Sequence, residues 1–585
     1  MEKQPIENIR HSLAHVMAAA VQDLYPGVKF GMGPAIDNGF YYDFDLPEGR
    51  KIVPEDLAAI ENKMREILAS GASFEREDIQ IGQAEKVFNG QKYKLEIVAD
   101  LKAGGEEKVS IYRTGEFVDL CKGPHVVSAK ELPADAFKLT KIAGAYWKGS
   151  EKNAMLTRIY AAAFANKKEL EEYLKQQEEA EKRDHRKLGK ELDLFVTSDL
   201  VGKGLPLLTP KGSIIRQILE RFIVDEETRR GYSRTYTPDL AKVDLYKKSG
   251  HWDHYKENMY PPITVDGEDY VLRPMCCPHQ FMIYNSRPHS YRELPIRYAE
   301  IAKLYRKEQS GELSGLIRVM SFSLVDAHIV CRPDQVEEEF ARVIDLIQYV
   351  MKTLGIKDYW YRFSKWDPAN KEGKYVNDPA AWEKTEASMK KIIDSMKLEY
   401  IEAENEAAFY GPKLDVQLRN VNGKEDTAFT VQIDFSMPNS FDMTYIDQEG
   451  KAQRPMVIHR SSIGCIERTM AFLIEQYAGA FPVWLSPVQA KILPVSEKHG
   501  EYARKLAEEL MRQDVRVELD DSNETVGNKI RKAVAEKSPY VLVIGDKEIE
   551  SGKLSVRDRG SRDTREIGKE EFVKEIKDQF PGKGA

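Results

Sequence analysis

Cysteine is scarce in this chain, with five among 585 residues, two of them adjacent. So few thiols do not make a disulfide framework, and we expect a reducing, cytoplasmic location. The N-terminal residues lack the apolar core of a signal peptide, and no run of about 18 apolar residues exists for a membrane span. We therefore expect no membrane partner.

Excess positive charge is also missing, because 95 acidic residues outnumber 87 basic ones and the net charge is −8. Any nucleic-acid binding must therefore use local basic patches, since the molecule as a whole does not attract polyanions. A phosphate loop of the Gly-x-x-x-x-Gly-Lys-Ser/Thr type does not occur either. If the chain binds a nucleotide, it does so with arginines. Hydrophobic content of 42% and charged content of 31% fit a globular protein with several cores.

Changes of pattern along the chain predict four regions. Residues 1–163 begin with a helix at 7–24 and continue with short apolar runs between glycine and proline turns. Residues 164–192 are charge-dense and free of proline, which predicts one long solvated helix joining two domains.

The rest of the chain predicts two further domains. In 193–485, strand-like stretches mix with helices, which is typical of an α+β domain around a largely antiparallel sheet. The stretches are 294–301, 429–435 and 456–459, and the helices are 212–230 and 334–354. In 486–585, apolar strands alternate with helices and indicate a small α/β domain with a largely parallel sheet. These strands are 490–495, 515–519 and 540–545.

Cys277, His328 and His459 form a candidate metal set, because basic residues suited to a nucleotide's phosphates are interleaved with them in the sequence. One thiolate and two imidazoles leave a coordination position open, which distinguishes a catalytic or substrate-binding zinc from a structural one. Their spacing alone proves nothing, and the alternative is a buried thiol with two hydrogen-bonded imidazoles.

Five residues near these ligands suit a nucleotide. Arginines grip phosphate oxygens with parallel hydrogen bonds, a glutamate can accept from the adenine amine, and an aromatic face can stack on a base. They are Arg306, Glu308, Arg318, Phe322 and Arg468. Taken singly, each arginine is more often a solvated surface charge.

The N-terminal region contains the pair His11-x-x-x-His15 and Cys121-x-x-x-His125. On spacing alone, the two histidines of the first motif resemble a zinc pair. The glutamate of a metalloprotease His-Glu-x-x-His motif is replaced here by Ser12.

The segments around Arg306, Arg318 and Arg468 resemble motifs 2 and 3 of class II aminoacyl-tRNA synthetases. Thr237-Pro238 resembles the dimer-forming motif 1. Adding Cys277, the run 326–328, His459 and the segment 409–413 makes the chain similar to the threonyl-tRNA synthetases over essentially its whole length.

This resemblance implies a multidomain α+β architecture. An editing domain at 1–163 and a linker helix at 164–192 would precede a class II catalytic core at 193–485 with an antiparallel sheet. An anticodon-binding α/β domain would occupy 486–585. The implied partners are tRNA(Thr), ATP, L-threonine and a second subunit, and no DNA.

The resemblance also assigns roles in threonine activation. One zinc ion per subunit, held by Cys277, His328 and His459, would contact the amino group and hydroxyl of threonine. Threonine would further be bound by Asp326, Tyr410 and Gln432. Valine matches threonine in shape, so a site that demands a hydroxyl rejects it better than an apolar pocket does.

For ATP, the implied roles are divided among the five residues named above. Arg306 would hold the α-phosphate, Glu308 the adenine amine and Phe322 the adenine face. Arg318 and Arg468 would hold the γ-phosphate, with Mg²⁺ offsetting charge. Arg306 and Arg468 thus act catalytically through charge. His251 is the candidate base for transfer to the tRNA ribose; the alternative is a structural histidine.

Serine also has the hydroxyl and lacks only one methyl, worth roughly 1–3 kcal/mol, so a hydrolytic second site is expected. Threonyl- and alanyl-tRNA synthetases share an editing domain that the N-terminal motifs resemble. The implied residues, used without a metal, are His11, His15, Tyr42, Lys94, Asp119, Cys121 and His125. The alternative is an RNA-binding domain without hydrolysis. Glu548 and Arg557 match positions expected to read anticodon bases, or are solvated charges.

The chain departs from the family at several positions. Cys276 stands where an asparagine is usual and could take over the zinc from Cys277. Met320-Ser321 replaces Arg-Gly, and Leu324 replaces a glutamine near the substrate, which removes a hydrogen-bonding group. The small ubiquitin-like N-terminal domain common in the family is not expected. The alternative function is a non-synthetic RNA-binding or editing-only paralogue.

Overall fold

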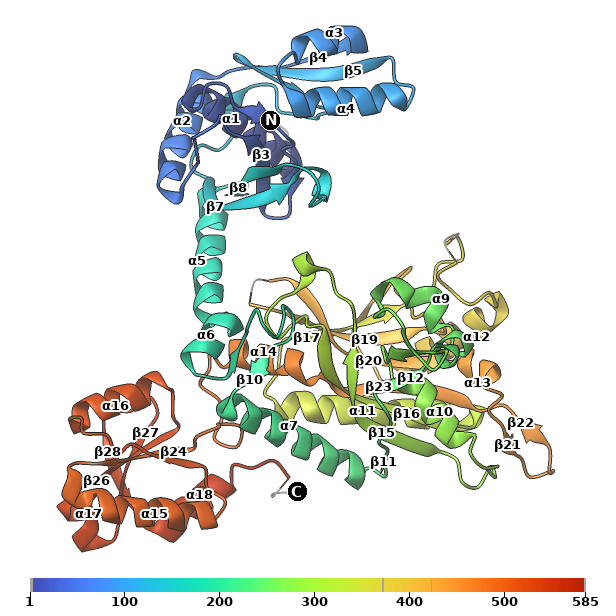
Figure 1. Ribbon diagram of the computed structural model, residues 1–585, viewed down its shortest axis with the longest axis vertical. Coiled ribbons are helices and arrows are strands. Elements are labelled where there is room, and N and C mark those ends of the chain that lie inside the picture. The colour runs from blue at the N-terminus through green and yellow to red at the C-terminus, as the bar shows by residue number, and fades with distance from the viewer. Residues whose placement is uncertain (1–3, 371–372, 422, 583–585) are drawn as a thin grey trace. The chain divides into compact units, whose positions relative to one another are not determined.

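The protein's structure is a computed structural model that describes residues 4–370, 373–421 and 423–582 (Figure 1). It divides into two compact units, Met1–Glu178 and Glu179–Ala585. Both units combine helices with sheets that are mainly antiparallel, which confirms the predicted α+β class. None of the helices in these described ranges is long and apolar enough to cross a membrane.

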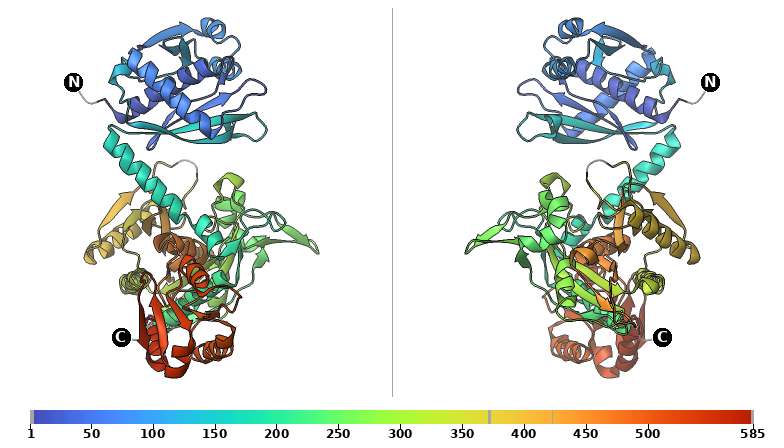
Figure 2. Two further views of the ribbon diagram at one scale, coloured as in Figure 1. Left: turned by 90° about the vertical axis from the view of Figure 1, so that its left-hand side faces the viewer. Right: turned by 90° about the vertical axis from the view of Figure 1, so that its right-hand side faces the viewer.

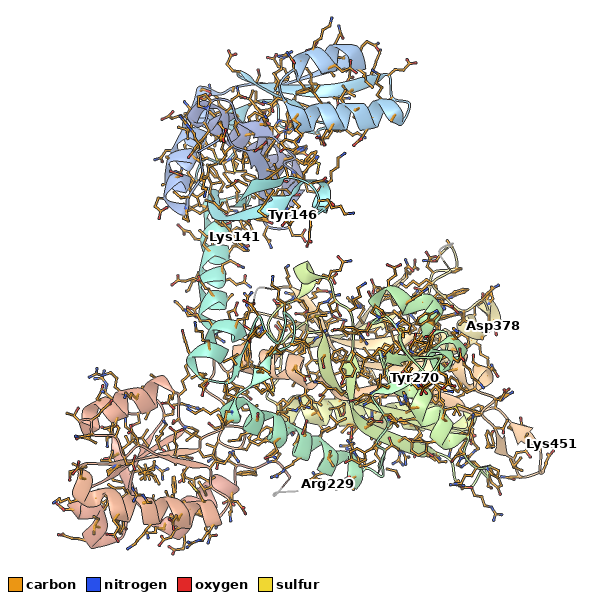
Figure 3. All side chains as sticks on the ribbon, in the orientation of Figure 1. Lys141, Tyr146, Arg229, Tyr270, Asp378 and Lys451 are labelled. Carbon is orange, nitrogen blue, oxygen red and sulfur yellow. The ribbon has the colours of Figure 1, made fainter. Side chains whose placement is uncertain are left out.

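Within its described residues, the first unit contains two antiparallel sheets, with the orders β1-β3-β8-β7 and β4-β5-β6. Figure 3 labels Lys141 and Tyr146, two exposed residues of β7. The strands of the first sheet are β1 (Lys29–Phe30), β3 (Gly39–Asp45), β7 (Phe137–Tyr146) and β8 (Met155–Ala163), with β2 (Ala35–Ile36) beside β3. The second sheet consists of β4 (Phe74–Gln80), β5 (Lys108–Thr114) and β6 (Phe117–Leu120).

Helix α1 (Ile6–Leu24) lies at the centre of this unit and confirms the helix predicted at 7–24. Every residue from Ser12 to Val21 is buried. A helix that is buried all round has no solvent face, and its run of small alanines allows neighbours to approach on several sides. These neighbours are α2 (Leu57–Ser70), β3 and β6. His11 and His15 are thereby held against the second sheet.

The predicted single linker helix at 164–192 is wrong. The segment forms two helices, α5 (Lys167–Arg183) and α6 (His185–Glu191). Asp184 separates them and caps α6, because its side chain accepts a hydrogen bond from the backbone N–H of Arg186. His185 is buried and its Nδ1 lies 2.7 Å from Glu475 Oε1. A buried histidine with an acidic partner breaks the expected pattern of a solvated helix.

The second unit contains an eight-stranded sheet in its described residues, with the order β11-β15-β16-β23-β20-β19-β17-β18. Its inner pairings are antiparallel and only the two edge pairings are parallel, which confirms the predicted largely antiparallel sheet. The central strands are β15 (Ile296–Tyr305), β16 (Ser321–Cys331), β23 (Met456–Cys465) and β20 (Glu425–Asp434). The outer strands are β19 (Lys413–Arg419), β17 (Tyr359–Ser364), β18 (Tyr400–Ala403) and β11 (Ser233–Arg234).

The two faces of the central strands differ in chemistry because side chains alternate along a strand. One face presents Ile329, Val431 and Ile458 to the main core. Helices cover this face, and two of them confirm the predictions at 212–230 and 334–354. They are α7 (Pro210–Arg229), α11 (Val336–Thr353) and α14 (Ile466–Gln476). The other face carries polar residues, among them His328 and His459.

The C-terminal part folds as a smaller α/β layer structure, with helices on both faces of its sheet (Figures 1 and 2). Its described strands have the order β25-β24-β26-β27-β28. The prediction of a largely parallel sheet is wrong, because the sheet is mixed. The pairs β24–β25 and β24–β26 are parallel, while β26–β27 and β27–β28 are antiparallel.

The bounds follow the predicted apolar runs closely. The strands are β24 (Ala490–Pro494), β25 (Val517–Leu519), β26 (Tyr540–Ile544), β27 (Leu554–Asp558) and β28 (Thr564–Ile567). The helices are α15 (Gly500–Arg512), α16 (Val526–Ala535), α17 (Asp546–Ser551) and α18 (Lys569–Lys577). Leu542 of β26 packs toward α15 and α18, whereas Val541 packs toward α16.

A buried ion pair joins α7 to β23, and we expect its loss to destabilise the fold. Glu227 and Arg460 are fully buried, with Glu227 Oε1 accepting from Arg460 Nη1 at 2.6 Å. Replacing Glu227 with glutamine leaves a buried, uncompensated guanidinium, so the free energy of unfolding should fall by about 3–5 kcal/mol. Urea denaturation followed by circular dichroism measures this loss.

The control is Glu338→Gln, which removes a surface pair with Arg342 whose carboxylate is 66% exposed. Its effect should stay within about 0.5 kcal/mol. Equal stability of the two variants would contradict a structural role for the buried pair.

Candidate functional site

The polar face of the central strands aligns the candidate metal ligands by register. His328 on β16 is the direct partner of His459 on β23, and His459 is the direct partner of Gln432 on β20. Directly paired residues point to the same face of a sheet. Asp326 lies two residues before His328 and shares that face. Four of the predicted site residues, from segments far apart in the sequence, therefore lie on one face of the sheet.

Cys277 completes a donor set from the first turn of α10 (Cys277–Tyr284). One ligand atom each from Cys277, His328 and His459 lies within 4.8 Å of the others, and all three residues are buried. The ring planes of the two histidines are perpendicular, with centroids 4.6 Å apart. Sulfur and two imidazole nitrogens at this separation fit a tetrahedral zinc with one open position.

The hydrogen bonds of the two histidines leave one nitrogen of each ring for an ion. His328 Nδ1 lies 2.6 Å from Gln280 Oε1, and His459 Nε2 lies 2.9 Å from Asp434 Oδ2. Among the described residues, His328 Nε2 and His459 Nδ1 are buried without a hydrogen-bond partner. Buried polar atoms are normally satisfied, so these two nitrogens indicate a missing partner. Partners that fix the ring orientation from behind are typical of metal-bound histidines.

Gln280 and Asp434 were not among the residues predicted from the sequence. Gln280 lies three residues after Cys277 on the same helix, and Asp434 lies two residues after Gln432 on the same strand. Each position shares a face with a predicted site residue, which is the signal that could have found it.

Electrostatics at this site reflect burial. Burial raises the pKa of the Cys277 thiol well above its usual value and lowers the pKa of His328 well below its usual value. Burial also raises the pKa of Asp326 to about 6. Without an ion, the thiol and the imidazole are therefore neutral.

The candidate nucleotide residues line one cavity of about 250 Å³ next to this donor set. Asp326, Tyr410, Gln432 and His459 line the same cavity. The nucleotide residues are Arg306, Glu308, Arg318, Phe322 and Arg468. The structure thus brings together all predicted ATP and threonine residues. They come from β16, β20, β23 and α14 and from the connections between strands.

The arginines are held by local contacts. The guanidinium of Arg306 lies over the Phe322 ring, 5.1 Å from its centroid. Arg318 Nε donates to Glu308 Oε2 at 2.8 Å, so these two candidates form an ion pair with each other. Arg468 donates to the backbone carbonyls of Ile317 and Thr427, both at 3.0 Å. These bonds fix the Arg468 guanidinium between β20 and the segment before β16.

On the threonine side, Tyr410 donates to Gln432 Oε1 and stacks on His459 with ring centroids 4.8 Å apart. Two departures from the family lie close together here. Cys276 belongs to a small apolar cluster, and Leu324 packs against that cluster. Leu324 lines the same cavity, so this part of the wall is apolar. Met320 adjoins β16, and its carbonyl accepts from the backbone N–H of Arg306.

His251 lines an adjacent cavity of about 400 Å³ that shares Arg306, Tyr410 and Gln432 with the first. The Ser249 hydroxyl donates to a backbone carbonyl and lies 2.8 Å from His251 Nδ1, which therefore carries the ring proton. His251 Nε2 remains an acceptor, 3.9 Å from Cys277 Sγ. Burial lowers the pKa of His251 to about 3, so the ring is neutral.

The first unit has a second polar cavity, of about 870 Å³, that contains most of the predicted editing residues. Lining residues include His11, His15, Lys94, Asp119 and Cys121. Tyr42 is buried and donates to Asp119 Oδ2 at 2.6 Å, and Lys94 donates to the Tyr42 hydroxyl at 3.1 Å. His15 Nε2 lies 3.3 Å from the same carboxylate. Tyr42, Lys94, Asp119 and His15 therefore form one connected network.

Cys121 holds a second group beside this network, because its Sγ lies 3.2 Å from His125 Nε2 and 3.3 Å from His11 Nε2. The His125 ring contacts the His15 ring, with centroids 4.1 Å apart. Ser12 was not predicted to contribute. Its hydroxyl accepts from the backbone N–H of Val126 and lies 3.1 Å from His125 Nδ1. The four residues of the two His/Cys motifs also place their ligand atoms within 4.8 Å of one another. Spacing and geometry therefore leave open whether this cluster takes a metal.

The predicted anticodon residues make local contacts in the C-terminal part. Glu548 accepts from the backbone N–H of Gly545 at the start of α17, and Arg557 donates to the Ser561 carbonyl from β27. Both side chains are half-buried. Their reading of anticodon bases remains a prediction.

Comparisons with known proteins agree with this geometry. The family described as tRNA synthetase class II core domain (G, H, P, S and T) matches residues 261–477. The anticodon binding domain family matches residues 489–579. The family described as threonyl and alanyl tRNA synthetase second additional domain matches residues 109–160.

Individual relatives cover nearly the whole chain. The threonine–tRNA ligase of Clostridium botulinum (strain Alaska E43 / Type E3) is 54% identical over 578 residues, which are 98% of this chain and 89% of that protein. The threonine–tRNA ligase of Geobacillus kaustophilus (strain HTA426) is 51% identical over 573 residues, 97% and 87% respectively.

A crystal structure of the RNA binding domain of threonyl-tRNA synthetase from Cryptosporidium parvum Iowa II matches with a TM-score of 0.65 and 34% identity. It covers 68% of this chain and 99% of that chain. Together with the class II core, these matches place the catalytic cavity in a known framework. The chain therefore belongs to the threonine–tRNA ligase family, with a class II synthetase core, an anticodon-binding domain and the domain shared with alanyl enzymes.

Proposed function

We propose that this protein charges tRNA(Thr) with threonine in the cytoplasm and acts as a homodimer. It activates L-threonine with ATP to threonyl-adenylate and pyrophosphate, transfers the threonyl group to tRNA(Thr), and hydrolyses seryl-tRNA(Thr). One observation supports this proposal above the others: His459 belongs to the donor set of Cys277, His328 and His459 and also lines the cavity of the ATP candidates.

Cys277, His328 and His459 would hold one Zn²⁺. When bound, the ion supplies a Lewis-acidic contact for the amino group and hydroxyl of threonine. Asp326 accepts from that hydroxyl. Valine offers no hydroxyl to the buried Asp326 carboxyl or to the ion, and a site built for a hydroxyl rejects an analogue that lacks it. Tyr410 and Gln432 close the same side of the cavity.

In the activation step, the threonine carboxylate attacks the α-phosphate of ATP, and pyrophosphate leaves. Arg306 stabilises the charge that develops on the α-phosphate, and Phe322 stacks on the adenine that Glu308 recognises. Arg318 and Arg468 hold the γ-phosphate, with Mg²⁺ accompanying the nucleotide. Positioning and charge stabilisation dominate this chemistry, so little proton transfer is required.

For transfer to tRNA, His251 is suited to accept the ribose hydroxyl proton. Its Nε2 is the unprotonated nitrogen, and the ring lines the adjacent cavity. The low pKa of about 3 makes it a weak base. The ribose hydroxyl attacks the threonyl carbonyl of the adenylate and AMP leaves, so His251 would hold the proton only briefly before it passes to the phosphate of the departing AMP.

Threonine-dependent pyrophosphate exchange tests the proposed function directly, paired with elemental analysis of the purified protein for zinc. Exchange with about one zinc per chain supports the ligase. Hydrolysis of seryl-tRNA without exchange would favour an editing-only enzyme. Absence of both activities in folded, zinc-loaded protein would favour an RNA-binding paralogue.

A supporting residue of the metal site gives a graded prediction. Asp434→Asn keeps the shape of the contact to His459 Nε2 but removes its charge. Metal affinity should fall about 10- to 100-fold, because the carboxylate fixes the ring and raises its basicity. Competition with a chromogenic chelator measures the affinity.

The matched control is Asp442→Asn, at a carboxylate that is 78% exposed. Its metal affinity should equal that of the unaltered protein. If both variants bind the ion equally well, Asp434 has no part in holding His459.

A further inference from the structure

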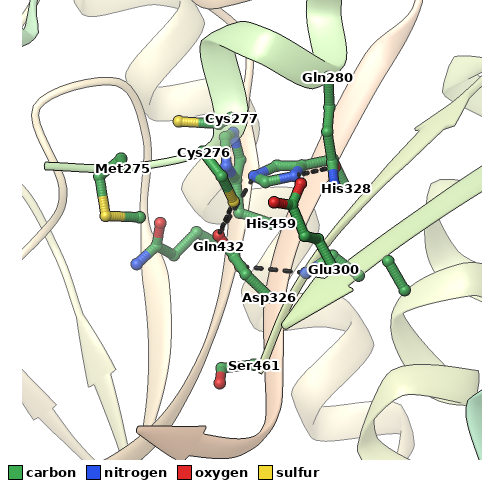
Figure 4. A network of polar contacts seen from close by, with 12 residues as sticks. Met275, Cys276, Cys277, Gln280, Glu300, Asp326, His328, Gln432, His459 and Ser461 are labelled. Atoms are coloured by element: carbon green, nitrogen blue, oxygen red, sulfur yellow. Dashed lines mark hydrogen bonds and ion pairs between the residues drawn. The ribbon is translucent and has the colours of Figure 1, made fainter. Parts of the chain in front are cut away.

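Cys276 is a buried thiol that the proposed reaction does not use. Its exposed fraction is 0%, and it lies directly before α10. Its Sγ donates to Asp326 Oδ2 at 3.3 Å, as Figure 4 shows, and the same oxygen lies 3.7 Å from His328 Nε2. One donor atom each from these three residues lies within 4.8 Å of the others. A second donor set therefore adjoins the first.

We propose that the metal ion has a second position, held by Cys276, Asp326 and His328, and that an ion there blocks threonine binding. This inference rests on the proposed function, because it concerns the same ion. The occupant is a thiophilic divalent cation such as zinc.

The geometry of the second set suits such an ion. In a tetrahedral zinc site, a sulfur and an oxygen ligand lie about 3.5–3.7 Å apart, and a nitrogen and an oxygen ligand about 3.3–3.5 Å apart. The separations here are 3.3 Å for Cys276 Sγ and Asp326 Oδ2 and 3.7 Å for His328 Nε2 and the same oxygen, so each atom needs to move by only a few tenths of an ångström. His328 Nε2, which is buried without a hydrogen-bond partner among the described residues, faces the Asp326 carboxyl. An unsatisfied buried nitrogen next to a thiol and a carboxyl points to a cation.

The two positions exclude each other because they share His328. Its Nδ1 is engaged by Gln280, which leaves Nε2 as the single nitrogen for an ion. Each chain therefore holds one ion at a time, either with Cys277 or with Cys276. Adding more metal does not fill both.

The second position removes the group that would receive the substrate. Asp326, proposed to accept from the threonine hydroxyl, becomes a metal ligand instead. The surroundings of Cys276 are apolar, with Ala302, Leu304 and Phe322 in the same cluster. Water has little access there, so an ion bound by this set is retained until threonine draws it to the other side. The apparent affinity for threonine is reduced by the fraction of ions in the second position.

Cobalt(II) is the probe for this proposal, because thiolate ligation gives it a charge-transfer absorption. Apo protein is loaded with Co²⁺, freed of excess metal, and analysed for cobalt content and absorption. Cys277→Ser should retain about one Co²⁺ per chain with thiolate absorption, since Cys276 remains. Its threonine-dependent exchange should fall at least about 100-fold. Changing Cys276 to serine as well should abolish the absorption.

A parallel variant, His459→Asn, protects the test against misfolding of Cys277→Ser. It removes a ligand of the first set only and should also retain cobalt, with absorption that is lost when Cys276→Ser is added. Circular dichroism and melting temperature verify that each variant is folded.

The outcomes separate the two proposals. Suppose that the unaltered protein binds cobalt and catalyses exchange, but that Cys277→Ser and His459→Asn bind no cobalt. This result would refute the second position alone. An unaltered protein with neither cobalt nor exchange would refute the proposed function and this inference together.

Discussion

His328→Ala abolishes metal binding and threonine activation together. This histidine belongs to both donor sets, so neither Cys277 nor Cys276 can compensate for it. We expect threonine-dependent exchange to fall on the order of 10³-fold, because several kcal/mol of interaction with the amino acid are lost. Elemental analysis after gel filtration should find no bound zinc in the variant.

The control for this experiment is His279→Ala. His279 is buried two residues after Cys277 but belongs to neither donor set. Its variant should keep the metal, so a general effect of removing a buried histidine is distinguished from loss of a ligand. If metal-free His328→Ala still catalyses threonine-dependent pyrophosphate exchange, the proposal that an ion recognises threonine is wrong.

His11→Ala should leave threonine charging intact and let seryl-tRNA(Thr) accumulate. The methyl that separates serine from threonine provides only about 10- to 200-fold discrimination, so the remaining accuracy depends on hydrolysis. His11 Nε2 contacts Cys121 Sγ at the mouth of the editing network. Removal of one group that positions water or the substrate should slow deacylation by about 10²- to 10⁴-fold.

Deacylation of purified seryl-tRNA(Thr), with pyrophosphate exchange as the parallel readout, measures the effect. Val127→Ala is the matched control, because Val127 is 73% exposed near the same motif. Unchanged serine clearance by His11→Ala would remove His11 from the editing role. Loss of exchange as well would indicate a folding defect instead.

The sequence motifs pointed to residues that the structure brings together, but not to the contacts that support them. Cys277, His328 and His459 carry donor atoms that few other residues offer, so their local motifs were informative. Gln280 and Asp434 are ordinary polar residues whose roles appear only when β16, β20 and β23 are paired in register. A single sequence contains no direct record of that register.

The two fold predictions that were wrong have related causes. The break at Asp184 depends on a buried contact between His185 and Glu475, which are 290 positions apart. The mixed C-terminal sheet depends on short connections after β26, which allow only antiparallel neighbours. Local charge and apolar patterns predict neither feature, because the first is set by a residue far along the chain and the second by the lengths of the connections between strands.

The direct pairing of His328 with His459 also limits how this family member can vary in length. Deleting one residue at the start of β23 would turn His459 toward the helices and bring Arg460 to the metal side. A substitution in these strands alters one side chain, whereas an insertion or deletion turns every following residue of the strand to the opposite face and disrupts the cavity. Tolerated length variation should therefore accumulate in the hairpin of β21 (Tyr445–Ile446) and β22 (Ala452–Gln453), upstream of the paired region.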